Sequence, residues 1–148
     1  MCESKKLKEV LKLGNHSLVN SYLKKRDLKK KKELLLPLTI SQCINCGLIQ
    51  LLKTVDPDDI YSDGKYLYFS RDVPGLNEYY KKYANYVKKK FIKNKNDLVV
   101  EIASNDGILL QHLKNKVKIL GIDAAPNAVL RALKHNIPTF PSLFNAKT

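Results

Sequence analysis

The chain has 148 residues, of which 44% are hydrophobic and 28% are charged. This composition is typical of a folded globular protein and excludes wholly disordered, collagenous and disulfide-stapled chains. The formal net charge is +13 and lies almost entirely in residues 1–95, where it attracts polyanions or serves solubility alone. There is no membrane-length apolar run and no apolar core of a secretory signal, so we expect a cytoplasmic protein with reduced thiols.

Residues 1–52 carry all three cysteines and are predicted to form a small N-terminal module. Its apolar stretches Leu34–Ile40 and Gly47–Leu52 have the composition of strands. Because proline cannot donate a hydrogen bond to a neighbouring strand, Pro37 indicates that the first of these is an edge strand.

Two of the cysteines lie in the sequence Cys43-Ile44-Asn45-Cys46-Gly47. This spacing puts two thiols on one tight turn, where both sulfurs can face a single cation, as in a zinc knuckle. A redox pair would need the first thiol at the N-terminus of a helix, whereas the residues that follow favour a strand. Zinc is therefore favoured over a redox pair or purely structural thiols.

A closed structural zinc site needs four ligands, and the chain offers Cys2 as the third. His16 is the fallback for the fourth, although a lone histidine is usually not a ligand. We therefore expect zinc on Cys2, Cys43 and Cys46, with His16 or water closing the fourth position.

Residues 53–95 are predicted to form a tyrosine-rich linker followed by an amphipathic helix. From Leu76 onward, aromatic and apolar residues recur at helical spacing, with lysines largely on the other side. We expect this stripe to pack in the core, because a phenol ring is mostly apolar surface. The stripe consists of Tyr79, Tyr80, Tyr83, Val87 and Phe91.

Residues 96–148 are predicted to begin a doubly wound parallel sheet. Strands are expected at 98–102, 117–122 and 137–140, with a helix after Gly107 and a second helix from Pro126. His112 and His135 fall in these two helices, where we expect them to be ordinary polar residues.

The loop after the first of these strands is where such a sheet binds a nucleotide-like cofactor. It lacks Gly-x-Gly-x-x-Gly, and its acids Glu101 and Asp106 would repel a phosphate but could meet an ammonium group or hydroxyls. That chemistry suits S-adenosylmethionine better than NAD. Asp123, at the end of the second strand, is placed to accept hydrogen bonds from a ribose. The alternative is that these acids only cap helices.

Three motifs in order resemble one family, the sugar C-methyltransferases with an N-terminal zinc-binding domain. They are the cysteine motif continued through Leu51, the stretch Tyr66-Leu67-Tyr68-Phe69-Ser70, and the loop Glu101-Ile102-Ala103-Ser104-Asn105-Asp106-Gly107. The segments 14–21 and 121–127 are also similar to that family. The resemblance runs nearly end to end along this chain, although the family is much longer.

The resemblance implies transfer of a methyl group from S-adenosylmethionine to a carbon beside the ketone of a nucleotide-linked deoxysugar, through an enolate. It also implies a structural zinc. Tyr66 and Tyr68 lie in the stretch that approaches the sugar and are the candidates for a catalytic role. The residues that it places in the cofactor site are Glu101, Ala103, Asn105, Gly107 and Asp123.

We therefore expect an α/β protein with a zinc-binding module (1–52), a linker (53–95) and the first half of a class I, Rossmann-like methyltransferase domain (96–148). The family's first zinc-binding cysteine and the region expected to hold the catalytic base are missing, so we expect a fragment and leave open whether it is active alone. The alternative is a basic zinc module that binds RNA or another polyanion through lysines and exposed tyrosines. Nucleic acid is the less favoured partner because arginines are few.

Overall fold

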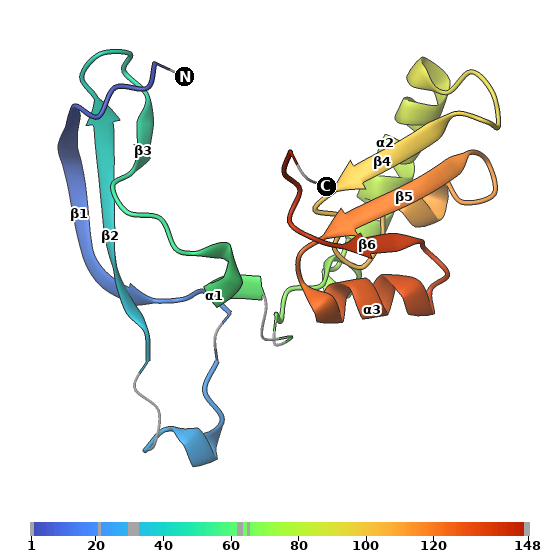
Figure 1. The fold of residues 1–148 in the computed structure, drawn as a ribbon. Coiled ribbons are helices and arrows are strands. Elements are labelled where there is room, and N and C mark those ends of the chain that lie inside the picture. The colour runs from blue at the N-terminus through green and yellow to red at the C-terminus, as the bar shows by residue number, and fades with distance from the viewer. Residues whose placement is uncertain (1, 21, 30–32, 62–63, 65, 147–148) are drawn as a thin grey trace. The chain divides into compact units, whose positions relative to one another are not determined.

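The computed structural model describes residues 2–20, 22–29, 33–61, 64 and 66–146. The chain divides into two compact units, Met1–Ile60 and Tyr61–Thr148, shown in Figure 1. Among the described residues, no helix combines the length and the apolarity that crossing a membrane requires. The three-part division at residues 52 and 95 stays a prediction.

The first unit is built on a three-stranded antiparallel sheet in the order β1-β2-β3. Its strands are β1 (Leu7–Ser17), β2 (Leu35–Cys43) and β3 (Ile49–Leu51). A 3-10 helix, Lys25–Asp27, lies between β1 and β2, and the short helix α1 (Pro57–Tyr61) follows β3.

The prediction that the strand containing Pro37 lies at a sheet edge is wrong, because β2 is the central strand. Pro37 is tolerated there because β3 pairs only with Ile40–Gln42, so no β3 residue lies opposite the proline. On the other side, the pairing with β1 is irregular between Lys12 and Asn15, next to the proline. Pro37 therefore lies where pairing with β3 is absent and pairing with β1 is irregular, which suits a residue without an N–H.

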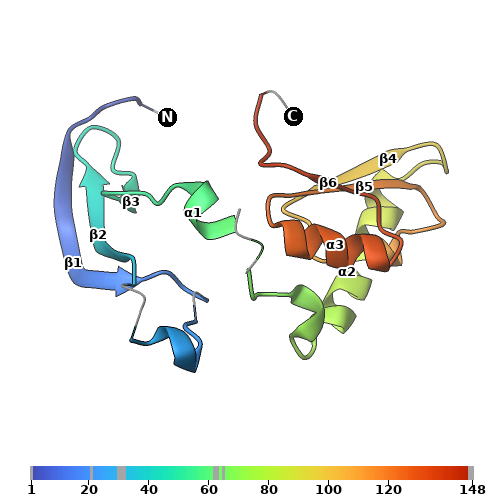
Figure 2. The same ribbon diagram turned by 60° about the horizontal axis from the view of Figure 1, so that its bottom comes forward.

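The second unit is a parallel sheet with helices on one face, which confirms the predicted α/β class. Its strands β4 (Leu98–Ile102), β5 (Lys118–Asp123) and β6 (Thr139–Pro141) lie in that order. The helices are α2 (Leu76–Phe91) and α3 (Pro126–Lys134), which Figure 2 shows on the same side of the sheet. Sequential parallel strands joined by a crossover helix are the opening of a Rossmann-like fold.

The helix expected after Gly107 is the main departure from the predicted elements. The structure has only a 3-10 helix, Leu110–His112, between tight turns. Its hydrogen bonds mix spacings of three and four residues, such as Leu113 N to Leu110 O at 3.0 Å and Lys114 N to Leu110 O at 2.9 Å. Leu110 and Leu113 are fully buried nevertheless. The apolar spacing therefore identified the buried residues but not the type of helix.

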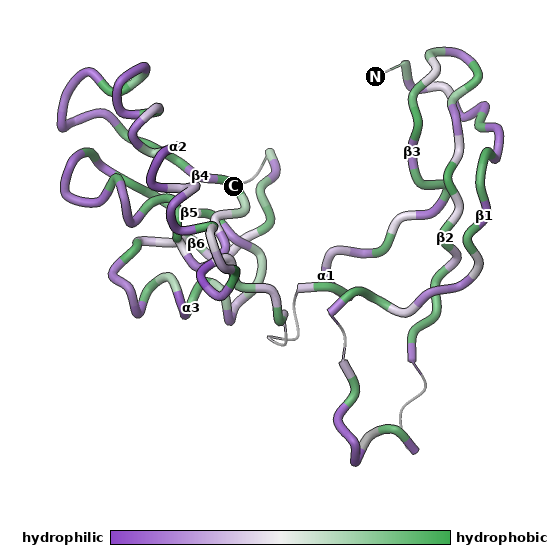
Figure 3. Tube along the Cα trace, turned by 180° about the vertical axis from the view of Figure 1, so that it is seen from behind, coloured by the Kyte–Doolittle hydropathy of each residue, from purple (hydrophilic) through white to green (hydrophobic). Residues whose placement is uncertain are grey.

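The core of this unit lies between the helices and one face of the sheet. Ala84 of α2 and Ala132 of α3 belong to two buried clusters, and Val99 and Ile119 pack against both of them. Hydrophilic residues dominate along α2 in the hydropathy colouring of Figure 3. On the opposite face of the sheet, apolar side chains are exposed: Leu98, Val100, Ile102 and Phe140.

Candidate metal centre and cofactor cavity

The three cysteines come together at the end of β2. Their Sγ atoms all lie within 4.8 Å of one another, and those of Cys2 and Cys43 are 3.6 Å apart. Two thiolates on one tetrahedral zinc, each at about 2.3 Å from the ion, would be about 3.8 Å apart. The thiol positions therefore fit a zinc ion on Cys2, Cys43 and Cys46.

Backbone hydrogen bonds build this centre from two distant segments. The N–H of Gly47 donates to the carbonyl of Cys43 at 2.9 Å and closes the turn between the two knuckle thiols. Gly47 has a φ of 76°, a conformation that glycine adopts without steric cost. The N–H of Ile44 donates to the carbonyl of Lys6 at 3.0 Å, which holds the segment containing Cys2 beside the turn.

The structure overturns His16 as the fallback fourth ligand. In the β1–β2 pairing Leu7 lies opposite Cys43, whereas His16 lies opposite Leu36 at the other end of the ladder. At about 3.4 Å per residue along a strand, the imidazole is more than about 20 Å from the thiols. Its Nε2 lies 2.8 Å from the carbonyl oxygen of Leu13 instead. Within the described part of the chain, no fourth His, Cys, Asp or Glu joins the three cysteines.

The pKa of the Cys2 thiol is lowered, which favours the thiolate form that binds metal. Its pKa is lowered to about 7, first by a hydrogen bond to the backbone of Ser4 and then by hydrogen bonds to Cys46 and Asn45. Zinc binds the thiolate rather than the thiol, so this shift favours metal binding by Cys2. For Cys46, a hydrogen bond to the backbone of Leu48 is outweighed by hydrogen bonds to Cys2 and Cys43, which raise the pKa.

The second unit contains a cavity of about 460 Å³ at the carboxyl ends of β4 and β5. This edge of an open parallel sheet is where such folds bind their ligands. Its lining residues come from the tyrosine-rich segment, α2, the β4 and β5 ends with the loops that follow them, and residues 142–144. They are Tyr61, Tyr66, Tyr68, Ser70, Tyr80, Ile102, Ala103, Asn105, Ile122, Asp123, Ala124, Ser142, Leu143 and Phe144.

Most of the residues named from the sequence surround this cavity. Tyr66, Tyr68, Ala103, Asn105 and Asp123 line it, whereas the other two cofactor candidates do not. One of these is Gly107, whose φ is 72° and where an added Cβ would lie 2.9 Å from a methyl carbon of Ile137. That glycine lets the loop pack against the core. The ligand contacts of these residues stay predictions.

Asp123 lines the cavity and connects the loop after β4 with the start of α3. Its carboxylate accepts the backbone N–H of Asn105 at 2.7 Å and that of Ala125 at 2.9 Å. It therefore fixes the loop after β4 and the start of α3, as the capping alternative expects. A carboxylate has about four acceptor positions, so Asp123 can still accept hydroxyl groups from a ligand in the cavity that it lines.

Glu101 is the other cofactor candidate that does not line the cavity. The pKa of its carboxyl group is strongly raised. Burial, followed by the nearby charges of Asp123 and Asp106, raises its pKa to about 8. Its Oε2 is buried and has no hydrogen-bond partner among the described residues. Because this oxygen is buried and Glu101 does not line the cavity, a contact between Glu101 and a ligand stays a prediction.

The structure corrects the expectation that Asp106 faces a ligand. Asp106 is fully buried, and its Oδ2 accepts the backbone N–H of Arg71 at 3.0 Å. Arg71 and Arg131 form ion pairs with it at 3.8 and 3.9 Å. Asp106 does not line the cavity, and its Oδ1 has no hydrogen-bond partner among the described residues.

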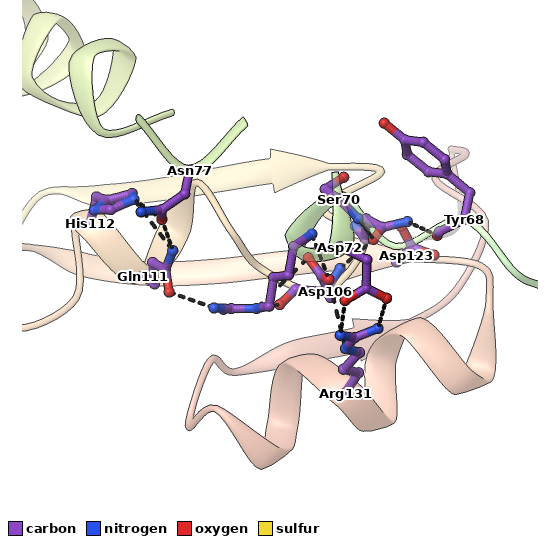
Figure 4. A network of polar contacts seen from close by, with 11 residues as sticks. Tyr68, Ser70, Asp72, Asn77, Asp106, Gln111, His112, Asp123 and Arg131 are labelled. Carbon is purple, nitrogen blue, oxygen red and sulfur yellow. Dashed lines mark hydrogen bonds and ion pairs between the residues drawn. The ribbon is translucent and has the colours of Figure 1, made fainter. Parts of the chain in front are cut away.

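These contacts belong to a polar network that holds the segment from Tyr66 to Asp72. Figure 4 shows its contacts at Tyr68, Ser70 and Asp72. The side-chain amide of Asn127 donates to the carbonyl of Tyr66 at 2.5 Å. Asp72 forms a two-pronged pair with Arg131, whose guanidinium also lies 4.5 Å from the centre of the Phe69 ring. The tyrosine segment is therefore fixed to the loops and helix of the cofactor side.

Sequence reasoning missed the parts played by Asn127, Arg71 and Arg131. A usable signal was present, because the chain has 27 basic residues and only Arg26, Arg71 and Arg131 are arginine. Arginine binds carboxylates through a rigid two-pronged group, whereas lysine acts as a mobile point charge. An arginine that stands out in a lysine-rich chain is therefore a candidate for a specific ion pair.

The two remaining histidines lie away from the cavity lining. His112 ends the 3-10 helix, with its Nε2 at 3.1 Å from the side-chain oxygen of Asn77 (Figure 4). Burial is the main cause that lowers its pKa. His135 is exposed at the C-terminus of α3.

Comparisons with known proteins give matches for the N-terminal module and for most of the chain. Residues 1–61 match the family model described as "Putative zinc binding domain". The C-methyltransferase NovU of Streptomyces niveus is 27% identical over 140 residues, which cover 94% of this chain and 33% of that protein. The chain therefore spans about a third of the length of this curated relative.

Among solved structures, one similar chain is the plantazolicin methyltransferase BamL in complex with a triazolic desmethylPZN analog and SAH. It shares 22% sequence identity with this chain, with a TM-score of 0.37. The match covers 58% of this chain and 34% of the other.

Proposed function

We propose that this chain binds S-adenosylmethionine and takes part in methyl transfer to carbon. The match of residues 1–61 to a zinc-binding family model and the similarity of the chain to the C-methyltransferase NovU support the proposal. One observation carries the proposal. Ala103, Asn105 and Asp123 follow or end neighbouring parallel strands and line one cavity of about 460 Å³. A buried acid at the end of the second strand is the group that binds ribose hydroxyls in nucleotide-binding folds of this type.

Within this proposal the residues of the site have distinct tasks. Asp123 accepts the ribose hydroxyls, while the Glu101–Gly107 loop surrounds the amino-acid end of the cofactor. When bound, the cofactor supplies an activated methyl group on sulfur. Glu101 does not line the cavity, and its proposed part follows from the motif resemblance alone.

The substrate that we propose is a nucleotide-linked keto-deoxysugar, on the basis of the motif resemblance. Tyr66 and Tyr68 both line the cavity, which supports their contact with such a substrate. Burial, followed by the nearby Tyr61, raises the pKa of Tyr66. A phenol with a raised pKa stays protonated at neutral pH, so Tyr66 would donate a hydrogen bond to a sugar oxygen rather than remove a proton.

Calorimetric titration with S-adenosylhomocysteine tests the cofactor part of the proposal. We expect Asp123→Ala to weaken binding about tenfold to a hundredfold, the loss for a charge-assisted hydrogen bond of about 1.5–3 kcal/mol. Asp97→Ala is the matched control, because Asp97 also accepts two backbone N–H groups, those of Lys93 and Asn94, but does not line the cavity. Binding that responds equally to both changes would contradict the assignment.

A second candidate function rests on the outer face of α2. Tyr79, Tyr83 and Tyr86 are 60%, 44% and 50% exposed, and their rings form two stacked pairs along the helix. The prediction that the stripe packs in the core is therefore wrong for Tyr79 and Tyr83, and also for Phe91, which is 60% exposed. Exposed stacked rings beside lysines are typical of surfaces that bind single-stranded nucleic acid.

Fluorescence anisotropy with a labelled single-stranded RNA separates the two functions. A polyanion-binding module would bind the RNA with a steep dependence on salt and would lose affinity in Tyr83→Ala. For the methyltransferase we expect weak binding that Tyr83→Ala does not change.

A further inference from the structure

Asn105 occupies the point where the cofactor loop and the tyrosine segment meet. Its backbone N–H donates to Asp123 at 2.7 Å. Its side-chain amide nitrogen donates to the carbonyl of Tyr68 at 3.0 Å, and its side-chain oxygen accepts the N–H of Ser70 at 3.0 Å. In Figure 4 the dashed lines therefore run from Asp123 to Tyr68 and Ser70 through a single residue.

The chemistry of this position requires asparagine. Its φ is 50°, a left-handed conformation that few residues other than glycine, asparagine and aspartate adopt readily. Glycine would satisfy the backbone but would remove both side-chain hydrogen bonds. Aspartate could accept from Ser70 but could not donate to Tyr68. Of the residues suited to this backbone, asparagine alone supplies both a donor and an acceptor.

The far end of the same segment is fixed by further contacts, although the side-chain oxygen of Asn105 also accepts the N–H of Asp106 at 2.9 Å. Asp106 accepts the N–H of Arg71, and Arg131 pairs with Asp72. The segment is therefore anchored at 71–72 by ion pairs, and its tyrosine-bearing part depends on the amides of Asn105 and Asn127. Two of its tyrosines line the same cavity as Asp123.

We propose that Asn105 is a positioning residue that couples the ligand-binding carboxylate of Asp123 to the placement of Tyr66 and Tyr68. The part of this inference that concerns the ligand rests on the proposed binding of S-adenosylmethionine. A ligand that engages Asp123 fixes the backbone of residue 105, and the side chain of the same residue holds the tyrosine segment. The tyrosines are then ordered in the cavity when the cofactor site is filled.

Amide hydrogen exchange in the ligand-free chain tests the positioning itself. In Asn105→Gly we expect the Ser70 amide to exchange at least tenfold faster, because its acceptor is lost. In Asn105→Asp we expect that amide to stay protected, because a carboxylate still accepts from it. Asn115→Gly is the matched control, since Asn115 has a φ of 65° and is exposed.

The pattern of exchange separates positioning from a general loss of stability. We expect the acceleration to be largest in residues 66–70, with a much smaller change in the amides of β5. Equal acceleration across both segments, or an unchanged Ser70 amide in Asn105→Gly, would overturn the proposal.

Addition of S-adenosylhomocysteine tests the coupling. We expect it to slow exchange at Ser70 in the wild type and in Asn105→Asp, but not in Asn105→Gly. Protection of Ser70 in the glycine variant at saturation would overturn coupling through the side chain. If the wild type binds no S-adenosylhomocysteine, the proposed function fails, while the ligand-free exchange still decides whether Asn105 positions the tyrosines.

Discussion

Ionisation of Glu101 lowers the stability of the folded chain. Its carboxyl group is largely removed from water beside Asp123 and Asp106, which raises its pKa from 4.5 to about 8. The folded state therefore holds a proton that the unfolded chain has lost over this interval. By linkage, the free energy of unfolding falls as the pH rises from about 4.5 to about 8 and then levels off.

Glu101→Gln removes this titration while keeping the size of the side chain. We expect the variant to be more stable than the wild type at pH 8 by on the order of 3 kcal/mol, and equally stable near pH 4.5. Urea unfolding at the two pH values measures the difference. A difference that is the same at both values would show that Glu101 titrates normally.

For single residues, the sequence predicted which of them lie at the cavity better than it predicted their contacts. Asp123 was named because it ends the second strand of a parallel sheet, and Ala103 and Asn105 were named from the motif resemblance. All three line the cavity. Asp106 was misjudged because its arginine partners come from positions 35 and 25 residues away in the chain. Local sequence carries no record of such tertiary pairs.

Among the elements, helix α2 illustrates what periodicity can and cannot predict. Its occurrence and its start at Leu76 follow from the spacing of apolar residues, and the structure confirms both. Rings occur on two sides of the helix, however, so the tyrosines did not identify the buried face. Ala84, only 1% exposed, marks that face, where it packs with Leu109 and Leu113.

Substitutions on the buried face of α2 should therefore lower the free energy of unfolding more than substitutions on its exposed face. Ala84→Leu would overpack the cluster, and we expect it to lower the free energy of unfolding by about 1–3 kcal/mol. Tyr83→Ala on the exposed face should change it by less than about 0.5 kcal/mol. Chemical denaturation of both variants measures these effects, and a larger loss for Tyr83→Ala would show that this ring is buried in solution.

For the molecule as a whole, the two units are stabilised by different means. The second has buried apolar clusters beneath its sheet. Among the described residues of the first unit, only one apolar residue, Cys43, is buried. Most other side chains of its strands are at least partly exposed. A module with so little core commonly depends on a structural metal.

We expect about one equivalent of zinc per chain purified under reducing conditions. Cys43→Ser should release the metal and speed amide exchange in β1, β2 and β3, because zinc contributes on the order of 10 kcal/mol of apparent binding energy in such modules. His16→Ala should keep the metal, since this residue lies at the other end of the ladder. Less than a tenth of an equivalent in the wild type, with three freely reactive thiols, would exclude the centre.

The division of the molecule also explains how far the sequence could predict its architecture. The parallel sheet was predictable because each of its strands is a short apolar run that alternates with helical patterns or turns. The long strand β1 was not, because polar and charged residues interrupt it and it is exposed along nearly its whole length. Its position follows from pairing with β2, which is a tertiary property.

The exposed apolar face of the parallel sheet makes the behaviour of the chain in solution depend on ionic strength. Leu98, Val100, Ile102 and Phe140 attract similar surfaces on other molecules, while a net charge of +13 keeps the molecules apart. The range of that repulsion shrinks from about 10 Å at 0.1 M salt to about 3 Å at 1 M. We therefore expect light scattering to detect self-association as salt is added, and Val100→Lys to suppress it.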